Sequence, residues 1–113
     1  MKKYIVIYHA TNDFMQQASI MSQEERTKEM DEWMLWARKC GDRLIDMGNP
    51  LMNGQELIKG GQSLASKRNV IGYSLLQAEN MDEAKSLLYE HPHIKMAADC
   101  SIEVHEAMQM PGM

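Results

Sequence analysis

Apolar residues gather in short runs along this chain, and a turn or helix signal follows most of them. Residues 4–8 read Tyr-Ile-Val-Ile-Tyr, and residues 70–76 read Val-Ile-Gly-Tyr-Ser-Leu-Leu. Both runs are rich in β-branched and aromatic residues, which favours strands. Residues 102–108 alternate between apolar and polar side chains, which is the period of a strand. We therefore expect a strand at each of these three places.

A long helix is expected between the first two strands. Ser22 and Glu25 stand three residues apart, the spacing of a capping box, in which the serine oxygen accepts a bond from the third amide of the helix. Beyond Ser22, apolar side chains repeat at helical spacing. The pattern predicts that this helix ends at Gly48, where glycine permits a left-handed cap.

A second helix is expected before the last strand. Asn80 and Glu83 repeat the capping-box spacing, and apolar residues follow them. The helix should run to about Glu90, because Pro92 cannot continue it. In the stretch between the first helix and residues 70–76, residues 55–59 indicate a short strand, with residues 60–61, both glycine, at a hairpin tip or bulge.

The order β-α-β-β-α-β is that of a ferredoxin-like α+β fold, an antiparallel sheet with both helices on one face. The first strand is apolar on both sides, with Tyr4, Val6 and Tyr8 pointing one way and Ile5 and Ile7 the other. A strand with one solvated face should alternate with polar residues instead. We therefore expect a second copy to cover the other face, giving a homodimer that closes a dimeric α/β barrel.

Chain length and charge narrow the class of protein. At 113 residues the chain is expected to form a single domain over residues 1–113, with residues 109–113 as a C-terminal tail. The formal net charge is −4 and the twelve basic residues are scattered, so we expect no nucleic-acid partner. No apolar run approaches the roughly twenty residues of a membrane span, so we expect no membrane partner. Cys40 and Cys100 lack a metal or redox motif, which is typical of reduced thiols in a cytoplasmic protein.

Five segments resemble the YCII-related proteins, in particular the YciI-like branch named for its DGPF motif. The resemblance covers nearly the whole chain: the opening strand at residues 1–8, Ser-Gln-Glu-Glu-Arg at 22–26 for Ser-Pro-Glu-Glu-Arg, Gly-Tyr at 72–73, Asp-Glu-Ala at 82–84, and Ile-Glu-Val at 102–104. The resemblance implies the ferredoxin-like fold and the dimer.

The signature motif of that family is degenerate in this chain. Residues 60–67 read Gly-Gly-Gln-Ser-Leu-Ala-Ser-Lys where the family has Asp-Gly-Pro-Phe-Ala-Glu-Ser-Lys, and only Gly61, Ser66 and Lys67 agree. The resemblance also implies a His-Asp pair near the first helix in YciI-type members, but residues 22–30 contain no histidine. The family's own site is therefore not carried over to this chain.

Histidines supply the candidate general bases, because the imidazole pKa lies near neutral pH. His9 ends the first strand, where its side chain can project into a cleft, and His93 follows the second helix. We name both as candidate catalytic residues; a structural role is the ordinary alternative. His91 and His93 form a His-x-His pair, but two imidazoles do not make a metal site, and we expect no metal.

Two functions from different classes remain open. The first is a small dimer that binds a small, partly apolar organic molecule between sheet and helices, with acid–base catalysis as its enzymatic form. We expect no cofactor, because phosphate-binding loops and dinucleotide fingerprints are missing. The second is a non-enzymatic assembly protein whose apolar sheet face only mediates oligomerisation. The residues expected to line the pocket are Tyr4, Tyr8, Trp33, Trp36 and Tyr73.

Overall fold

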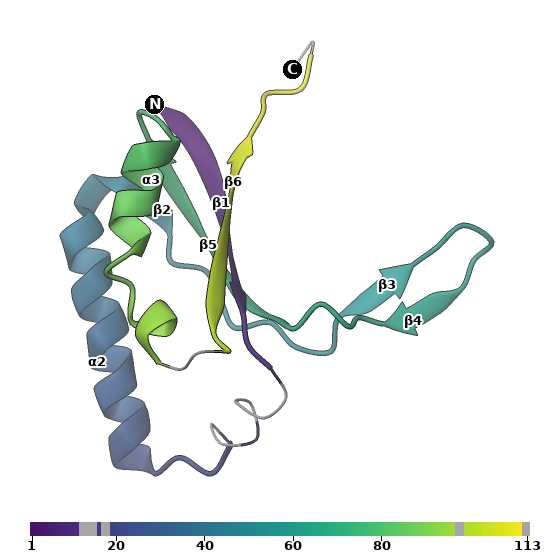
Figure 1. The fold of residues 1–113 in the computed structure, drawn as a ribbon, viewed down its shortest axis with the longest axis horizontal. Helices are drawn as coiled ribbons and strands as arrows, with labels where there is room; N and C mark the ends of the chain where they lie inside the picture. The colour runs from purple at the N-terminus through teal and green to yellow at the C-terminus, as the bar shows by residue number, and fades with distance from the viewer. Residues whose placement is uncertain (12–15, 17–18, 97–98, 112–113) are drawn as a thin grey trace.

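Four antiparallel strands form one sheet in the order β2-β5-β1-β6 (Figure 1). β1 (Lys2–His9) and β5 (Val70–Ala78) lie in the middle, and β2 (Leu44–Asp46) and β6 (Ser101–Ala107) form the edges. The computed structural model describes residues 1–113 apart from 12–15, 17–18, 97–98 and 112–113. All three strands expected from the sequence are present.

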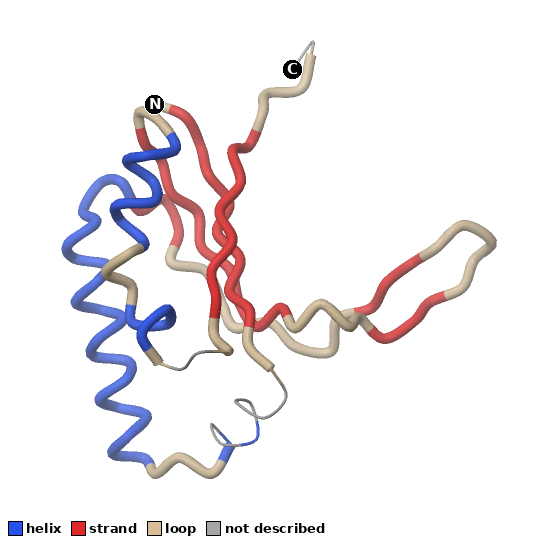
Figure 2. The backbone as a smooth tube through the Cα atoms, viewed as in Figure 1, coloured by secondary structure: helices blue, strands red, loops and turns tan. Residues whose placement is uncertain are grey.

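The helices α2 (Gln23–Cys40) and α3 (Met81–Leu88) lie on the same side of the sheet (Figure 2). Two short 3-10 helices, η1 (Gly41–Arg43) and η2 (Pro92–Lys95), follow them. The α+β class expected from the sequence is confirmed.

Both predicted helix starts are confirmed by their caps. The Ser22 side chain accepts a hydrogen bond from the Glu25 amide at 3.1 Å, and its hydroxyl donates to the Glu25 carboxylate. The Asn80 side chain accepts from the Glu83 amide at 2.9 Å. Each cap satisfies an amide that the first turn of a helix leaves without a partner.

The predicted end of the first helix at Gly48 is wrong. α2 ends at Cys40, because Gly41 takes a positive φ of 58° and its amide bonds back to Ala37. Leu44 belongs to β2 and pairs with Leu76 of β5. The helical spacing of apolar residues continues to Leu44 because this first residue of β2 packs against the same core as the apolar face of α2.

The core lies between the sheet and its helices. Three alternate side chains of β1, Tyr4, Val6 and Tyr8, point into it and are fully buried. The other buried residues of this core are Trp36, Cys40, Leu76, Ala78, Ala84 and Leu88. On the opposite face, Ile5 lies between Leu75 and His105 and is 39% exposed. We call this opposite face, which neither helix covers, the open sheet face (Figure 2).

A hairpin projects from the body of the molecule (Figure 1). It consists of β3 (Gln55–Leu57) and β4 (Ser63–Ala65), and Gly60 and Gly61 lie in its tip with φ of 103° and 89°. The expected hairpin is confirmed, with a strand shorter than residues 55–59. It forms a two-stranded sheet of its own, so the expectation that residues 55–59 supply the second strand of the main sheet is wrong, and β2 takes that place. At the other end of the chain, residues 108–111 follow β6 with exposed side chains, and the rest of the predicted tail lies outside the described residues.

The segment at residues 47–52 packs against β5. The Ser74 hydroxyl donates to the Met47 carbonyl at 2.6 Å, and the Leu51 amide donates to the Ile71 carbonyl at 2.9 Å. At Gly48, where φ is 82°, an added Cβ would stand 1.7 Å from the carbonyl oxygen of Tyr73. Only glycine therefore permits this close approach.

We expect Gly48→Ala to destabilise the protein by at least about 3 kcal/mol, because it strains the backbone and pushes the segment off Ser74. Gly61→Ala is the matched control: its φ is also positive, but an added Cβ meets nothing within 4 Å. That control should cost at most about 2 kcal/mol. Equal losses in chemical denaturation would contradict the close approach.

Candidate functional site

A cavity of about 610 Å³ lies between the N-terminal half of α2, the end of β1, the start of β5 and residues 47–52. Most of its wall is apolar, and the wall includes Tyr8, Met30, Trp33, Leu51, Ile71 and Tyr73. Cavities of this size and character are typical of sites for small organic ligands.

One face of α2 builds the helical side of the cavity. Positions 26, 29, 30 and 33 all line it, and they follow the spacing that places residues on one side of a helix. Further along, the same side reaches Trp36 and Cys40, which are buried in the core. The C-terminal half of α2 therefore packs on the sheet, while its N-terminal half leaves room for a ligand.

A bulge shapes the sheet side. In the pairing of β1 with β5, Tyr8 faces Gly72 and His9 faces Val70, so Ile71 is the extra residue. A bulge re-aims the side chains next to it. Ile71, Gly72 and Tyr73 all line the cavity.

Tyr8 contributes its ring to the wall and its hydroxyl to a buried chain of hydrogen bonds. Ser74 donates to the Met47 carbonyl at 2.6 Å, so the Ser74 oxygen accepts from the Tyr8 hydroxyl at 2.7 Å. Burial raises the pKa of Tyr8, although the bond to Ser74 acts in the opposite direction. Tyr8 therefore stays protonated and serves as wall and anchor instead of as an acid or base.

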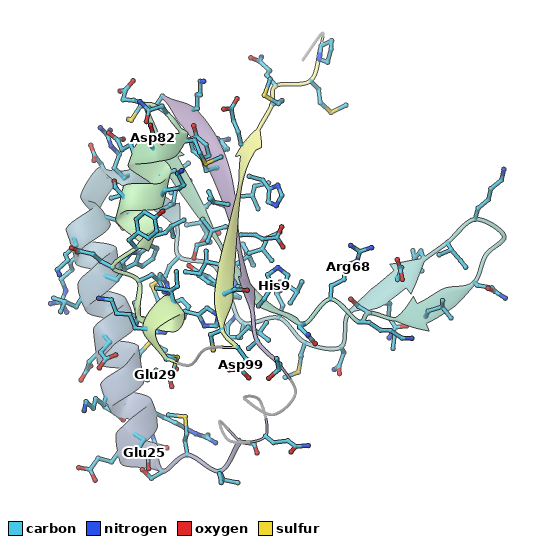
Figure 3. The ribbon with its side chains drawn as sticks, in the orientation of Figure 1. His9, Glu25, Glu29, Arg68, Asp82 and Asp99 are labelled. Carbon is cyan, nitrogen blue, oxygen red and sulfur yellow. The ribbon has the colours of Figure 1, made fainter. Side chains whose placement is uncertain are left out.

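Among the described residues, Glu29 supplies the one carboxyl group of the cavity wall, and it projects from the side of α2 that faces the sheet (Figure 3). Within that part of the chain, the carboxyl group of Glu29 has no hydrogen-bond partner, and no cationic side chain lies within 4.0 Å of it. Burial raises the pKa of Glu29, and the charge of Glu32 raises it further. Both effects favour the protonated form of this carboxyl group over its charged form.

Arg26 is the cation of the cavity. One guanidinium nitrogen donates to the Ser19 carbonyl at 3.3 Å, and no carboxylate of the described residues lies within 4.0 Å. Tyr73 and Asn49 add weaker polar groups, since the Asn49 amide nitrogen lies 3.5 Å from the Tyr73 hydroxyl. The polar groups of the cavity are therefore few, and its two charged groups are unpaired within the described part of the chain.

His91 stands behind the cavity wall in an aromatic cluster. Its ring centre lies 4.3 Å from both Trp33 and Trp36 and 4.8 Å from Tyr8. Its Nδ1 accepts a bond from the His93 amide at 2.9 Å, so the neutral ring carries its proton on Nε2. That nitrogen has no polar partner among the described residues. The indole rings of Trp33 and Trp36 pack against the imidazole at interplanar angles of 88° and 65°.

Three of the five aromatic residues expected at the site, Tyr8, Trp33 and Tyr73, line the cavity. The structure places Tyr4 and Trp36 in the hydrophobic core. Trp36 is 3% exposed, and its indole nitrogen donates to the Leu87 carbonyl at 2.9 Å. Alternation along β1 explains Tyr4, which shares the inward face with Tyr8 but lies further from the cavity end.

The two candidate catalytic histidines lie outside the cavity lining. His93 is buried, and its Nε2 donates to the backbone carbonyl of His9 at 2.9 Å. Burial lowers the pKa of His93, whereas its backbone hydrogen bonds raise it. The ring of His9 bonds instead to groups on the open sheet face, because it occupies an odd position of β1.

His9, Glu103 and His105 form a hydrogen-bonded cluster on the open sheet face. Glu103 accepts from His105 at 2.9 Å and from His9 at 2.5 Å through separate oxygens, and these bonds lower the pKa of Glu103. The other nitrogen of His9 contacts the Arg68 carbonyl at 2.8 Å, at the base of the hairpin (Figure 3). Both partners of His9 are acceptors, so both bonds form together only when its ring carries two protons.

Arg26 and Glu29 are the site residues that sequence reasoning missed. Both stand at helical spacing before Trp33, which was expected in the pocket, and that spacing was the available signal. Polar residues beside an apolar stripe ordinarily belong to a solvated face, so the pattern alone does not single them out.

Comparison with protein-family profiles and with curated proteins gave no match for this chain. Within the described residues, no three His, Cys, Asp or Glu side chains are grouped so as to hold a metal ion. Over the same residues, no helix has the length and apolar character to cross a membrane.

We expect the protein to lose stability as the pH falls below about 6.5. Burial, helped by the charge of His93, lowers the pKa of His91 from 6.5 to about 3. Between pH 6.5 and pH 3, His91 therefore binds a proton in the unfolded chain but stays neutral in the folded protein. The contribution of His91 to the free energy of unfolding is fully present above pH 6.5, and it falls by up to about 1.4 kcal/mol for each pH unit below that value.

Urea denaturation from pH 7.5 to 4.5 measures this slope. His91→Phe should lower the slope, even if it lowers stability at every pH, because it removes one buried histidine. His105→Gln, at an exposed position, should leave the slope in place. A slope unchanged by His91→Phe would show that other groups control the acid sensitivity.

Proposed function

We propose that this protein binds a small, partly apolar organic molecule in the cavity between α2 and the sheet. The observation that carries the proposal is the apolar cavity of about 610 Å³ with few polar groups on its wall. Small-molecule sites have this combination, in which apolar area gives affinity and a few polar groups give orientation. Trp33 and Tyr8 are the aromatic residues of α2 and β1 on this wall.

The enzymatic form of this function is acid–base catalysis without a cofactor. It requires a group on the cavity wall that exchanges a proton near neutral pH. Because His9 and His93 are not among the lining residues, we do not assign the step to them. Glu29 meets the requirement by position, since it faces the cavity and is not engaged by another described residue.

We further propose that the protein has a ferredoxin-like fold and works as a cytoplasmic homodimer joined through the open sheet face. The strand order β2-β5-β1-β6 supports the fold. The apolar side chains of the open sheet face support the pairing, because Ile5 is 39% exposed and lies beside Leu75. Two sheets packed face to face would bury both rows and close a dimeric α/β barrel.

The alternative is an assembly protein with no small-molecule ligand. The apolar side chains of the open sheet face favour it, since Ile5 is 39% exposed and lies directly opposite Leu75. Apolar side chains grouped on a surface are typical of contact sites for other proteins. Ligand binding to the cavity separates the two functions.

Filling the cavity should abolish ligand binding. Met30 lines the cavity but is 55% exposed, so Met30→Trp should be tolerated by the fold while its indole occupies ligand space. We expect it to weaken the binding of the neutral probe N-phenyl-1-naphthylamine at least tenfold in equilibrium dialysis.

Met34→Trp is the matched control, because Met34 lies on the same helix, is 41% exposed and does not line the cavity. It should change the affinity less than twofold. Equal affinities for both variants would place the probe elsewhere, and absence of binding by the unmodified protein would favour the assembly function.

Charging the open sheet face should separate the proposed dimer. We expect Ile5→Lys to shift the protein from dimer to monomer in sedimentation velocity at micromolar concentration, because it would bury an unpaired charge in the interface. Leu35→Lys, at a position of α2 that is 52% exposed, should leave the dimer intact. A monomeric unmodified protein would refute the pairing.

A further inference from the structure

Two opposite charges share the cavity without neutralising each other. Arg26 and Glu29 are three residues apart on the lining face of α2, yet no ion pair joins them within 4.0 Å, and neither pairs with another described side chain. Surface charges at this spacing commonly pair along a helix. Here the cavity wall instead presents an unneutralised cation and a separate carboxyl group to whatever enters.

Arg26 has the geometry of an anion receptor. Its guanidinium has five N–H donors, and one nitrogen is used by the Ser19 carbonyl. The remaining donors form a planar fork that matches the two oxygens of a carboxylate. Arg26 is exposed, so the anion would sit toward solvent and keep part of its hydration.

Glu29 presents the complementary group deeper along the wall. Its side chain is half-buried, and the neighbouring lining residues on α2 are Met30 and Trp33. A carboxyl group in such surroundings gains from a ligand hydroxyl, because the described protein offers it no partner of its own. Trp33 lines the same wall one turn beyond Glu29, so it supplies apolar surface for a ring beside this carboxyl group.

We infer that the ligand is a ring-bearing organic acid, with its carboxylate held by Arg26 and a hydroxyl group on the ring bonded to Glu29. This inference rests on the proposed function, since it names the ligand class of the same cavity. The ring supplies the apolar contact, and the two ends fix its orientation. Selectivity for the acid comes from Arg26, and selectivity for the hydroxyl comes from Glu29.

Three naphthalene probes test the two contacts by isothermal titration calorimetry: 6-hydroxy-2-naphthoate, 2-naphthoate and 2-naphthol. We expect the unmodified protein to bind the hydroxy acid most tightly. Arg26→Gln should weaken both acids at least tenfold and leave 2-naphthol within twofold. Arg38→Gln, an exposed arginine on the same helix outside the cavity, should change none of the three.

Glu29 has its own test with the same probes. Glu29→Leu should remove the advantage of 6-hydroxy-2-naphthoate over 2-naphthoate, because a leucine cannot bond the hydroxyl. Glu29→Gln should keep most of that advantage, since its amide still accepts or donates. If Glu29 has only a structural role, Glu29→Leu should weaken the binding of 6-hydroxy-2-naphthoate and of 2-naphthoate by the same factor.

The outcomes separate the two levels of the argument. If none of the three probes binds, the proposed small-molecule function fails. If 2-naphthol binds as tightly as the acids and Arg26→Gln changes nothing, the cavity binds ligands but the inferred selectivity for an organic acid is wrong.

Discussion

A buried chain of hydrogen bonds from Tyr8 through Ser74 to the carbonyl of Met47 holds the cavity together. These groups lie in the core, where each polar atom left without a partner costs about 1–3 kcal/mol. The chain fastens residues 47–52 to the sheet, and Gly48 lets the backbones meet. The position of residues 47–52, which line one side of the cavity, therefore depends on the hydrogen bonds of Ser74. The same bonds engage the Tyr8 hydroxyl, so this group is committed to holding the wall in place.

The two halves of α2 use the same helix face for different contacts. Toward its C-terminus, Trp36 and Cys40 are packed against sheet and α3, and this half supplies the stability that the rest requires. Toward its N-terminus, the same face carries Arg26 and Glu29 over open volume. Holding unpaired polar groups beside an apolar wall reduces stability locally, so the packed half must offset it. This division is common at binding sites, where local rules of packing are relaxed.

Sequence patterns predicted the elements better than the site. β1, β5, β6, both capping boxes and the hairpin follow from local signals, whereas β2 was taken for part of the first helix. The end of α2 did not follow from such signals, because Gly41 and Gly48 both allow a positive φ and only the pairing of β2 decides between them. The site was harder, since a cavity arises where an element fails to pack.

The projecting hairpin touches the rest of the fold mainly at its base, and a two-stranded ribbon is marginally stable in isolation. Its tip at Gly60 therefore behaves as a tolerant point of the chain, where a peptide tag or a small domain can be inserted without disturbing core packing. The tip is also an accessible point for a protease. An affinity handle placed there would lie away from α2 and the packed core (Figure 1).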